Sequence, residues 1–180
     1  MTTLEKKNAA FSALPPMKKR VAIAEDIRLQ LRTKKFIAGS GYGHEKKAHY
    51  YGRDFPLGDL QQHLKAGSVC EGCAKAACIV SRAKLGNSIV VDEGTYNSDL
   101  AHATSAEIFG EECSNLIEEI YEMSNSYDRT DDENEAIDAY IERLPCREED
   151  PRGRMDAIYK NIVTNSGHLV IRHKGKVYKY

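Results

Sequence analysis

The chain has 180 residues, of which 41% are hydrophobic and 29% are charged, and its formal net charge is -1. This length fits one domain with a hydrophobic core, and the charge excludes the uniformly basic surface of a dedicated nucleic-acid-binding domain. No window contains the run of about 18 apolar residues that a transmembrane helix needs, so we expect no membrane partner. The first residues hold no apolar stretch long enough for a signal peptide, and we expect a cytoplasmic protein.

The charges are strongly segregated along the chain. Residues 1–55 carry 12 Lys or Arg and 5 Asp or Glu, residues 92–150 carry 3 and 19, and residues 151–180 carry 7 and 1. The acidic segment can dock on the basic ends of its own chain, or on those of a second copy in a homo-oligomer. Faces with separate partners and ordinary solvated helix faces explain the same pattern.

The first third of the chain predicts a lead-in, a long helix and a loop. Residues 1–14 are rich in Lys, Asn, Ala and Ser, and we expect them to be flexible. A helix is predicted to begin at Pro15–Pro16, because proline is tolerated in a first turn. It ends before residues 39–43, where three glycines in five residues do not continue a helix. The residues predicted on its buried face are Ile23, Ile27 and Leu31.

The middle of the chain predicts two further helices and a short strand. A short helix runs from Gly58 to about Lys65. Ser68 and Glu71 have the spacing of a capping box, in which each side chain bonds the other residue's backbone N–H, so a helix is expected from Ser68 to Gly86. Residues 88–91 are typical of a short strand.

The rest of the chain predicts three helices and a hairpin. Two more capping boxes, Thr104 with Glu107 and Thr130 with Glu133, open acidic helices. Asp150 followed by Pro151 begins the last helix, and the tail alternates around Lys174-Gly175 as a β-hairpin does. We therefore predict a mainly α fold, with residues 15–180 forming a single compact domain of about six helices and a small C-terminal β-hairpin.

The glycine loop is the strongest candidate for a ligand site. The residues expected to contact or shape a ligand are Gly39, Gly41, Gly43, Lys46, Lys47, Tyr50 and Arg53. Flexible backbone amides beside cations and aromatic rings suit a phosphate group or a nucleotide base. The loop matches neither the Rossmann nor the P-loop spacing, so an ordinary helix end with a surface loop is the alternative.

The cysteines offer a second candidate site. Cys70, Cys73 and Cys78, with His63, have the residue types of a Cys3His zinc site. Cys73 and Cys78 would point in different directions on one helix, so packing of small buried thiols is the alternative. A redox role for Cys70 and Cys73 would use the lowered pKa of a thiol at a helix N-terminus. We predict no cofactor, with zinc as the exception to be tested.

The sequence shows no catalytic signature, neither G-x-S-x-G nor H-E-x-x-H. Six histidines are scattered along the chain, and His102 is expected at a helix start rather than in the role of a base. We therefore favour a protein without enzymatic activity.

One stretch of the chain begins with Cys70 and Cys73 and continues to the acidic residues 117–122, and a second holds Asn161, Asn165 and Gly167. The two stretches resemble a group of uncharacterised proteins encoded by bacteriophages and other mobile elements. The likeness covers roughly residues 55–168, and Ala76 stands where that group is expected to have glycine. Its members keep the cysteine that matches Cys73 more reliably than the other two, which argues against zinc. The matching residues are Cys70 to Ala77, Ser81 to Leu85, Ile108 to Gly110 and Ile117 to Glu122, followed by Arg154, Met155, Ile158, Asn161, Ile162, Asn165 and Gly167.

The resemblance implies a context rather than an activity, because small phage proteins often act by binding a host protein or a signalling nucleotide. The leading hypothesis is an anti-defence binding protein that sequesters a small phosphorylated ligand or masks a host protein. The alternatives are an enzyme that processes nucleotides or nucleic acids with a histidine as general base, and a zinc-stabilised interaction module.

Overall fold

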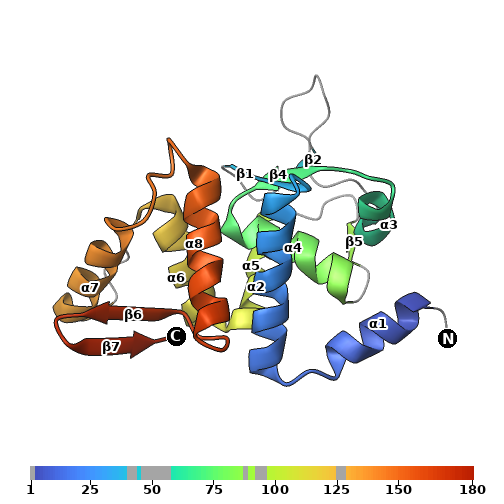
Figure 1. The fold of residues 1–180 in the computed structure, drawn as a ribbon. Helices are drawn as coiled ribbons and strands as arrows, with labels where there is room; N and C mark the ends of the chain where they lie inside the picture. Colours follow the sequence, from blue (N-terminus) through green and yellow to red (C-terminus); the bar gives the residue numbers. More distant parts are fainter. Residues whose placement is uncertain (1–2, 40–43, 46–57, 87–88, 92–96, 125–128) are drawn as a thin grey trace.

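The computed structural model describes residues 3–39, 44–45, 58–86, 89–91, 97–124 and 129–180. In Figure 1 these residues form helices with three small groups of strands. The helices are α1 Thr3–Ser12, α2 Pro16–Arg32, α3 Leu60–Lys65, α4 Ala74–Leu85, α5 Asn97–Phe109, α6 Glu111–Glu122, α7 Asp131–Ile141 and α8 Pro151–Thr164. The strands are β1 Phe36–Ala38, β2 His44–Glu45, β3 Gly58–Asp59, β4 Cys70–Gly72, β5 Val90–Val91, β6 Val170–His173 and β7 Lys176–Lys179.

The predicted fold class is confirmed: the chain is mainly helical, forms a single compact domain and ends in a small antiparallel hairpin. The described ranges contain eight helices where about six were expected. One addition comes from Gly110, whose φ of 80° ends α5 and divides the predicted acidic helix in two. The other is α1, which lies within the segment expected to be a flexible lead-in. Phe11 at its end is buried in the core, which gives this short helix a packing partner.

Two of the predicted capping boxes are wrong. Ser68 does not begin a helix, because Cys70–Gly72 form β4 and α4 begins only after Cys73. Thr104 is buried inside α5, which begins at Asn97. In both places the packing of the whole domain overrides a local capping signal. The third box is present at Thr130, whose hydroxyl accepts a hydrogen bond from the Glu133 N–H.

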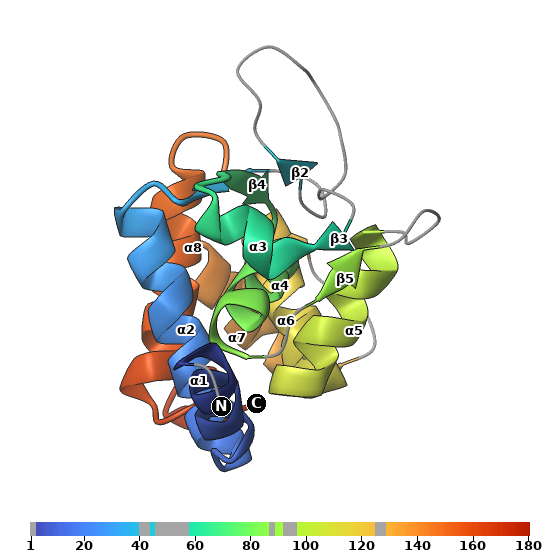
Figure 2. The same ribbon diagram turned by 90° about the vertical axis from the view of Figure 1, so that its right-hand side faces the viewer.

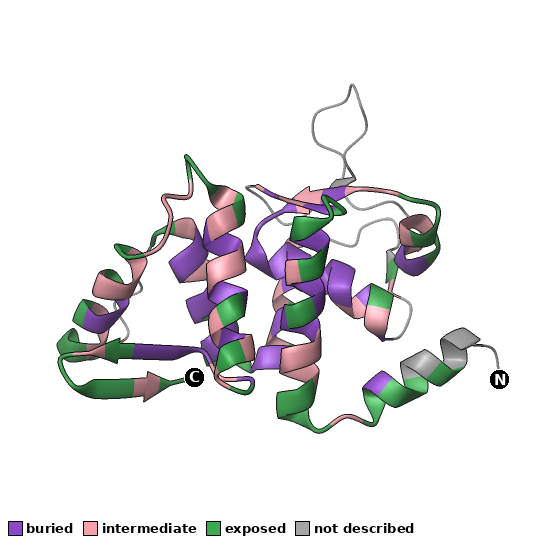
Figure 3. Cartoon of the chain, in the orientation of Figure 1, coloured by how far each residue is buried: buried purple, intermediate pink, exposed green. Residues whose placement is uncertain are grey.

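Helix α4 is the centre of the core. Every residue from Ala74 to Ala83 except Arg82 is buried. Figure 2 shows α4 between α2 and α8 on one side and α5 on the other, and Figure 3 shows the buried residues gathered where these helices meet. Its alanines are small and let the neighbouring helices approach closely. The buried faces of α2, α6 and α8 also point into this core, and that of α2 holds the predicted Ile23, Ile27 and Leu31.

Helices α2 and α8 pack side by side in opposite directions. Near one end, Arg28 Nε lies 2.8 Å from the Asp156 carboxylate. Near the other end, Gly167 has a φ of 99°, and a Cβ atom added at this residue would lie only 2.8 Å from the Met17 carbonyl oxygen. Gly167, which follows α8, is therefore needed for both backbone conformation and close packing.

Two arginines bind the carbonyl groups at helix ends. Arg20 of α2 donates hydrogen bonds to the carbonyls of Ile108 and Phe109, at the end of α5. Arg154 of α8 is buried and donates to the carbonyls of Ile120 in α6 and Pro145 in the connection before α8, both at 2.8 Å. Burial lowers the pKa of the Arg154 guanidinium. Both side chains satisfy carbonyl groups that a helix or loop leaves without a backbone donor.

Asn161 fixes the hairpin to α8. Its Oδ1 accepts a hydrogen bond from the Val170 N–H at 2.9 Å, and its Nδ2 donates to the Val170 carbonyl at 2.8 Å. The same amide donates to the Tyr140 hydroxyl, and Asn165 donates to the Asn161 carbonyl. The asparagines of the C-terminal motif that carries the phage-protein resemblance therefore have structural roles.

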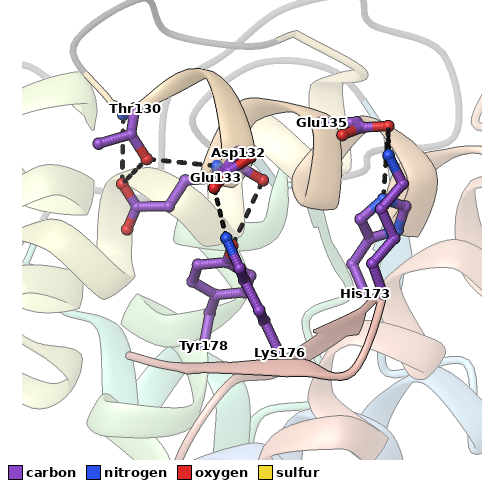
Figure 4. A network of polar contacts seen from close by, with 8 residues as sticks. Thr130, Asp132, Glu133, Glu135, His173, Lys176 and Tyr178 are labelled. Atoms are coloured by element: carbon purple, nitrogen blue, oxygen red, sulfur yellow. Dashed lines mark hydrogen bonds and ion pairs between the residues drawn. The ribbon is translucent and has the colours of Figure 1, made fainter.

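The acidic helix α7 docks on the basic C-terminal hairpin (Figure 4). Lys176 binds the Asp132 carboxylate, Lys174 Nζ lies 2.5 Å from the Glu135 carboxylate, and His173 contacts the same carboxylate at 3.6 Å. An acidic segment thus binds a basic end of its own chain, which is one of the explanations offered above for the segregated charges.

This contact should weaken in acid. The hydrogen bond from Lys176 lowers the pKa of Asp132, and the hydrogen bond from Lys174 lowers that of Glu135. A carboxyl whose pKa is lower in the folded chain stabilises the fold at pH values above the ordinary pKa of 3.8 for aspartate and 4.5 for glutamate. This contribution is lost as the pH falls through the folded pKa. Carboxyl NMR titration should show both lowered values, and Lys176→Met should raise the pKa of Asp132. An unchanged Asp132 titration in that variant would contradict the ion pair.

In the described part of the chain, no helix is long and apolar enough to cross a membrane.

Candidate functional site

The predicted ligand segment begins at Gly39, the only one of its seven proposed site residues that the structure describes. Gly41, Gly43, Lys46, Lys47, Tyr50 and Arg53 lie outside the described residues. Gly39 directly follows β1, and its N–H donates a hydrogen bond to the Gly72 carbonyl at 2.9 Å. Its own carbonyl accepts a hydrogen bond from the Tyr121 hydroxyl at 2.9 Å. A Cβ atom at Gly39 would lie 2.9 Å from a carboxylate oxygen of Glu71, so a glycine suits this close approach.

Strand β4 holds both sides of the glycine segment. It pairs in parallel with β1, with Phe36 opposite Cys70 and Ala38 opposite Gly72. On its other edge it pairs antiparallel with the backbone of β2, with His44 opposite Glu71. Directly after β4, Cys73 is the N-cap residue of α4. The start of the glycine segment is therefore fixed beside the first turn of the central helix.

Lys75 is the centre of a polar cluster in the first turn of α4. Its side chain is fully buried, and its Nζ contacts three acceptors on two other helices. These are Glu118 Oε2 at 2.7 Å and Asn115 Oδ1 at 3.0 Å on α6, and His102 Nδ1 at 2.6 Å on α5. An ammonium group has three N–H donors, so this geometry satisfies all of them. The cluster joins three helices, and its outer members reach the surface because Asn115 is exposed.

The contact with Lys75 fixes the tautomer of His102. A lysine ammonium only donates, so His102 Nδ1 must accept and the ring proton lies on Nε2. The lone pair that faces the cluster is thus occupied. His102 lies within α5, seven residues before its end, and not at the helix start expected from the sequence.

Tyr121, which holds the Gly39 carbonyl, has charged groups beside it. Burial raises the pKa of the Tyr121 hydroxyl, and the nearby Glu122 carboxylate raises it further. The pKa of Glu122 is raised, because the effect of its burial is larger than the opposing effect of its ion pair with Arg147. The Arg147 guanidinium lies 6.0 Å from the centre of the Tyr121 ring. Tyr121 is therefore a protonated donor that holds the Gly39 carbonyl.

Cys70 and Cys73 are buried, and the raised pKa of Cys73 does not favour redox chemistry at this pair. Burial raises the pKa of Cys73 to about 12, although this residue caps a helix, and that of Cys78 to about 11. Cys78 also contacts the Ala74 carbonyl and the Tyr159 hydroxyl. Reactive cysteines are thiolates near neutral pH, and these are not.

The proposed zinc ligands are not brought together. His63, Cys70, Cys73 and Cys78 all lie in the described ranges, where no three His, Cys, Asp or Glu side chains are placed to hold a metal ion. Cys70 belongs to β4 and Cys78 faces Tyr159 of α8. A zinc site at these residues therefore has no geometric support in this conformation.

The five cysteines differ in their exposure to solvent. Cys146 is the partly exposed cysteine, whereas the other four are buried. Native protein treated with iodoacetamide at pH 8 should gain one alkyl group, at Cys146, and denatured protein should gain five. Mass spectrometry of peptides measures this, and Cys146→Ser should gain none in the native state. Rapid labelling of Cys73 in native protein would show that its burial and raised pKa are wrong.

A small hollow beside α1 has a structural explanation. It measures about 110 Å³, below the roughly 300–1,000 Å³ of typical ligand pockets. The Arg82 guanidinium lies 5.4 Å from the Phe11 ring centre and 3.3 Å from the Glu107 carboxylate. These contacts attach α1 to the rest of the domain.

The chain matches no protein-family model, no curated protein and no solved structure. Sequence reasoning missed the Lys75 cluster, whose one local signal was a lysine inside an alanine-rich, otherwise apolar helix. Its partners lie 27, 40 and 43 positions later, where nothing in the sequence pattern links them to Lys75.

Proposed function

We propose that this protein binds and sequesters a small phosphorylated ligand, such as a nucleotide, without transforming it. The contacts are assigned to the segment with Gly39, Gly41 and Gly43, and the groups that would hold the ligand are Lys46, Lys47, Tyr50 and Arg53. The observation that carries this proposal is the anchoring of Gly39 between β4 and α6. Its N–H, its carbonyl and the space at its Cα are each fixed by a neighbouring residue.

A rigid scaffold beneath a glycine-rich segment is how many binding loops are positioned. Lysine and arginine supply charge for phosphate oxygens, a tyrosine ring can stack on a base, and glycines let backbone N–H groups approach the ligand. Three reactive groups at the start of α4 have internal partners or are buried: Lys75 has three acceptors, and Cys73 and Cys78 are protonated thiols. This supports a scaffold for binding at this end of the domain.

The resemblance to phage proteins supplies the proposed setting. In that setting the bound molecule is a signalling nucleotide of a host defence system, and sequestration prevents the signal. Masking of a host protein is the second candidate. It is favoured by acidic side chains beyond the hairpin contact that stay exposed, namely Asp131, Asp138, Glu142, Glu148 and Glu149.

The enzymatic alternative would use a histidine as general base. His102 lies in the Lys75 cluster, and its Nδ1 already accepts a hydrogen bond from Lys75. Product formation from any nucleotide would favour this alternative over binding alone. The zinc alternative predicts a lower melting temperature in chelator.

The test uses native mass spectrometry and thermal unfolding of the untagged protein. The probes are adenosine and guanosine mono-, di- and triphosphates, cyclic mononucleotides and cyclic dinucleotides. A bound probe at about 100 times its Kd should raise the free energy of unfolding by about 2.7 kcal/mol. The variant Lys46→Ala/Lys47→Ala/Arg53→Ala should lose both the added mass and this stabilisation.

A matched control removes the same number of positive charges from exposed positions elsewhere, as Lys18→Ala/Lys35→Ala/Lys160→Ala. This variant should keep the ligand. If both variants lose ligand binding equally, the loss is caused by the lower net charge and not by the removal of specific contacts. Binding by neither wild-type protein nor control, for every probe, would overturn the proposed function.

A further inference from the structure

The C-terminal hairpin has one covered edge and one open edge. Figure 1 shows β7 on the outer side of β6, at one end of the molecule. The edge of β6 that faces away from β7 is covered, because Asn161 binds both backbone groups of Val170 and Arg143 donates to the Arg172 carbonyl. Within the described chain, β7 pairs only with β6.

The hydrogen-bond pattern shows which groups of β7 point outward. Leu169 and Tyr180 exchange both backbone hydrogen bonds, at 3.2 and 3.0 Å. In an antiparallel pair, residues that exchange two bonds alternate with residues that exchange none. Tyr178 and Lys176 therefore bond to β6, whereas Val177 and Lys179 direct their N–H and carbonyl groups away from it.

The side chains at this edge have a defined character. Val177 is 52% exposed, and both Arg172, which lies opposite Val177 in the strand register, and Lys179 are exposed as well. Lys174 and Lys176 are on the hairpin too, but they already pair with Glu135 and Asp132 of α7. The remaining positive charges, beside an apolar side chain and unused backbone groups, favour an extended segment with acidic residues.

We infer that the outer edge of β7 binds an acidic, extended segment of a partner protein as an added antiparallel or parallel strand. The backbone groups of Val177 and Lys179 form the hydrogen bonds, Val177 contacts an apolar side chain, and Lys179 and Arg172 attract carboxylates. A second copy of this chain is the disfavoured occupant, because pairing β7 with β7 would bring the Lys179 and Arg172 side chains of both copies together. This site uses no residue of the proposed ligand loop, so either proposal can fail alone.

The test uses a short capped peptide of alternating glutamate and valine, with a lysine–valine peptide of the same length as its control. In backbone NMR spectra, the glutamate peptide should shift the Val177 and Lys179 amide signals and slow their hydrogen exchange. The lysine peptide should leave them unchanged. Absence of these changes with the glutamate peptide, or equal changes with both peptides, would overturn the inference.

Two variants locate the interaction. Val177→Pro removes an outward N–H and leaves the bonds between β6 and β7 in place, so it should abolish binding of the glutamate peptide. Lys179→Glu keeps the backbone and should weaken binding by roughly fivefold, whereas Lys35→Glu on an exposed site elsewhere should not. Full binding by Lys179→Glu would overturn the charge assignment. Self-association that Val177→Pro removes would identify a second copy as the occupant and overturn the acidic partner.

Discussion

Lys75→Met should lower the free energy of unfolding by about 3 kcal/mol, because it leaves Glu118 and His102 facing one another without the cation that joins them. Methionine keeps most of the side-chain volume, so the loss reports the polar contacts more than a cavity. Urea denaturation measures the change. The exposed Lys35→Met should change stability by no more than about 0.5 kcal/mol.

A double-mutant cycle separates the ion pair from the rest of the Lys75 cluster. Glu118→Gln in the Lys75→Met background removes the uncompensated carboxylate and should recover about 1 kcal/mol of the loss. If the two substitutions are simply additive, the 2.7 Å contact between Lys75 and Glu118 does not stabilise the domain. A Lys75→Met protein that is as stable as wild type would leave the buried lysine available for another role, such as catalysis.

Asn161→Leu should lower the free energy of unfolding by about 2–4 kcal/mol. The leucine leaves the N–H and carbonyl of Val170, which is 3% exposed, without their partners, and unsatisfied buried backbone groups are costly. Hydrogen exchange of the Val170 amide should rise together with the loss of stability. Lys160→Leu, the neighbouring exposed position, is the matched control and should have little effect.

Asn161→Asp refines this test. Aspartate still accepts from the Val170 N–H but has no hydrogen to donate to the Val170 carbonyl. The free energy of unfolding of Asn161→Asp should therefore lie between the values of wild type and Asn161→Leu. An Asn161→Leu protein with unchanged stability and altered ligand binding would instead make the asparagine motif functional.

Local patterns were sufficient for much of the helical fold. The buried faces of α2, α6 and α8 follow from apolar residues at helical spacing, and the turn at Lys174-Gly175 follows from alternation and a glycine. These features depend on residues close together in the sequence. The cap at Thr130 is predictable for the same reason.

Long-range pairing explains where the prediction departs from the structure. Cys70–Gly72 become β4 because β1 and β2 bind both edges, and those partners are 25 or more positions earlier in the chain. The same is true of Lys75, whose acceptors come from two later helices. For the ligand loop, only the position of Gly39 is described, so Lys46, Lys47, Tyr50 and Arg53 stay predictions that binding experiments must test.

The arginines at helix ends have a consequence for folding cooperativity. Arg20 and the carbonyl of Ile108 are 88 residues apart, and Arg154 and the carbonyl of Ile120 are 34 apart. The last turns of α5 and α6 therefore gain donors only after α2 and α8 have docked. Partial unfolding of α2 or α8 should fray those turns at the same time, so the four helices should open as one unit with a shared protection against hydrogen exchange.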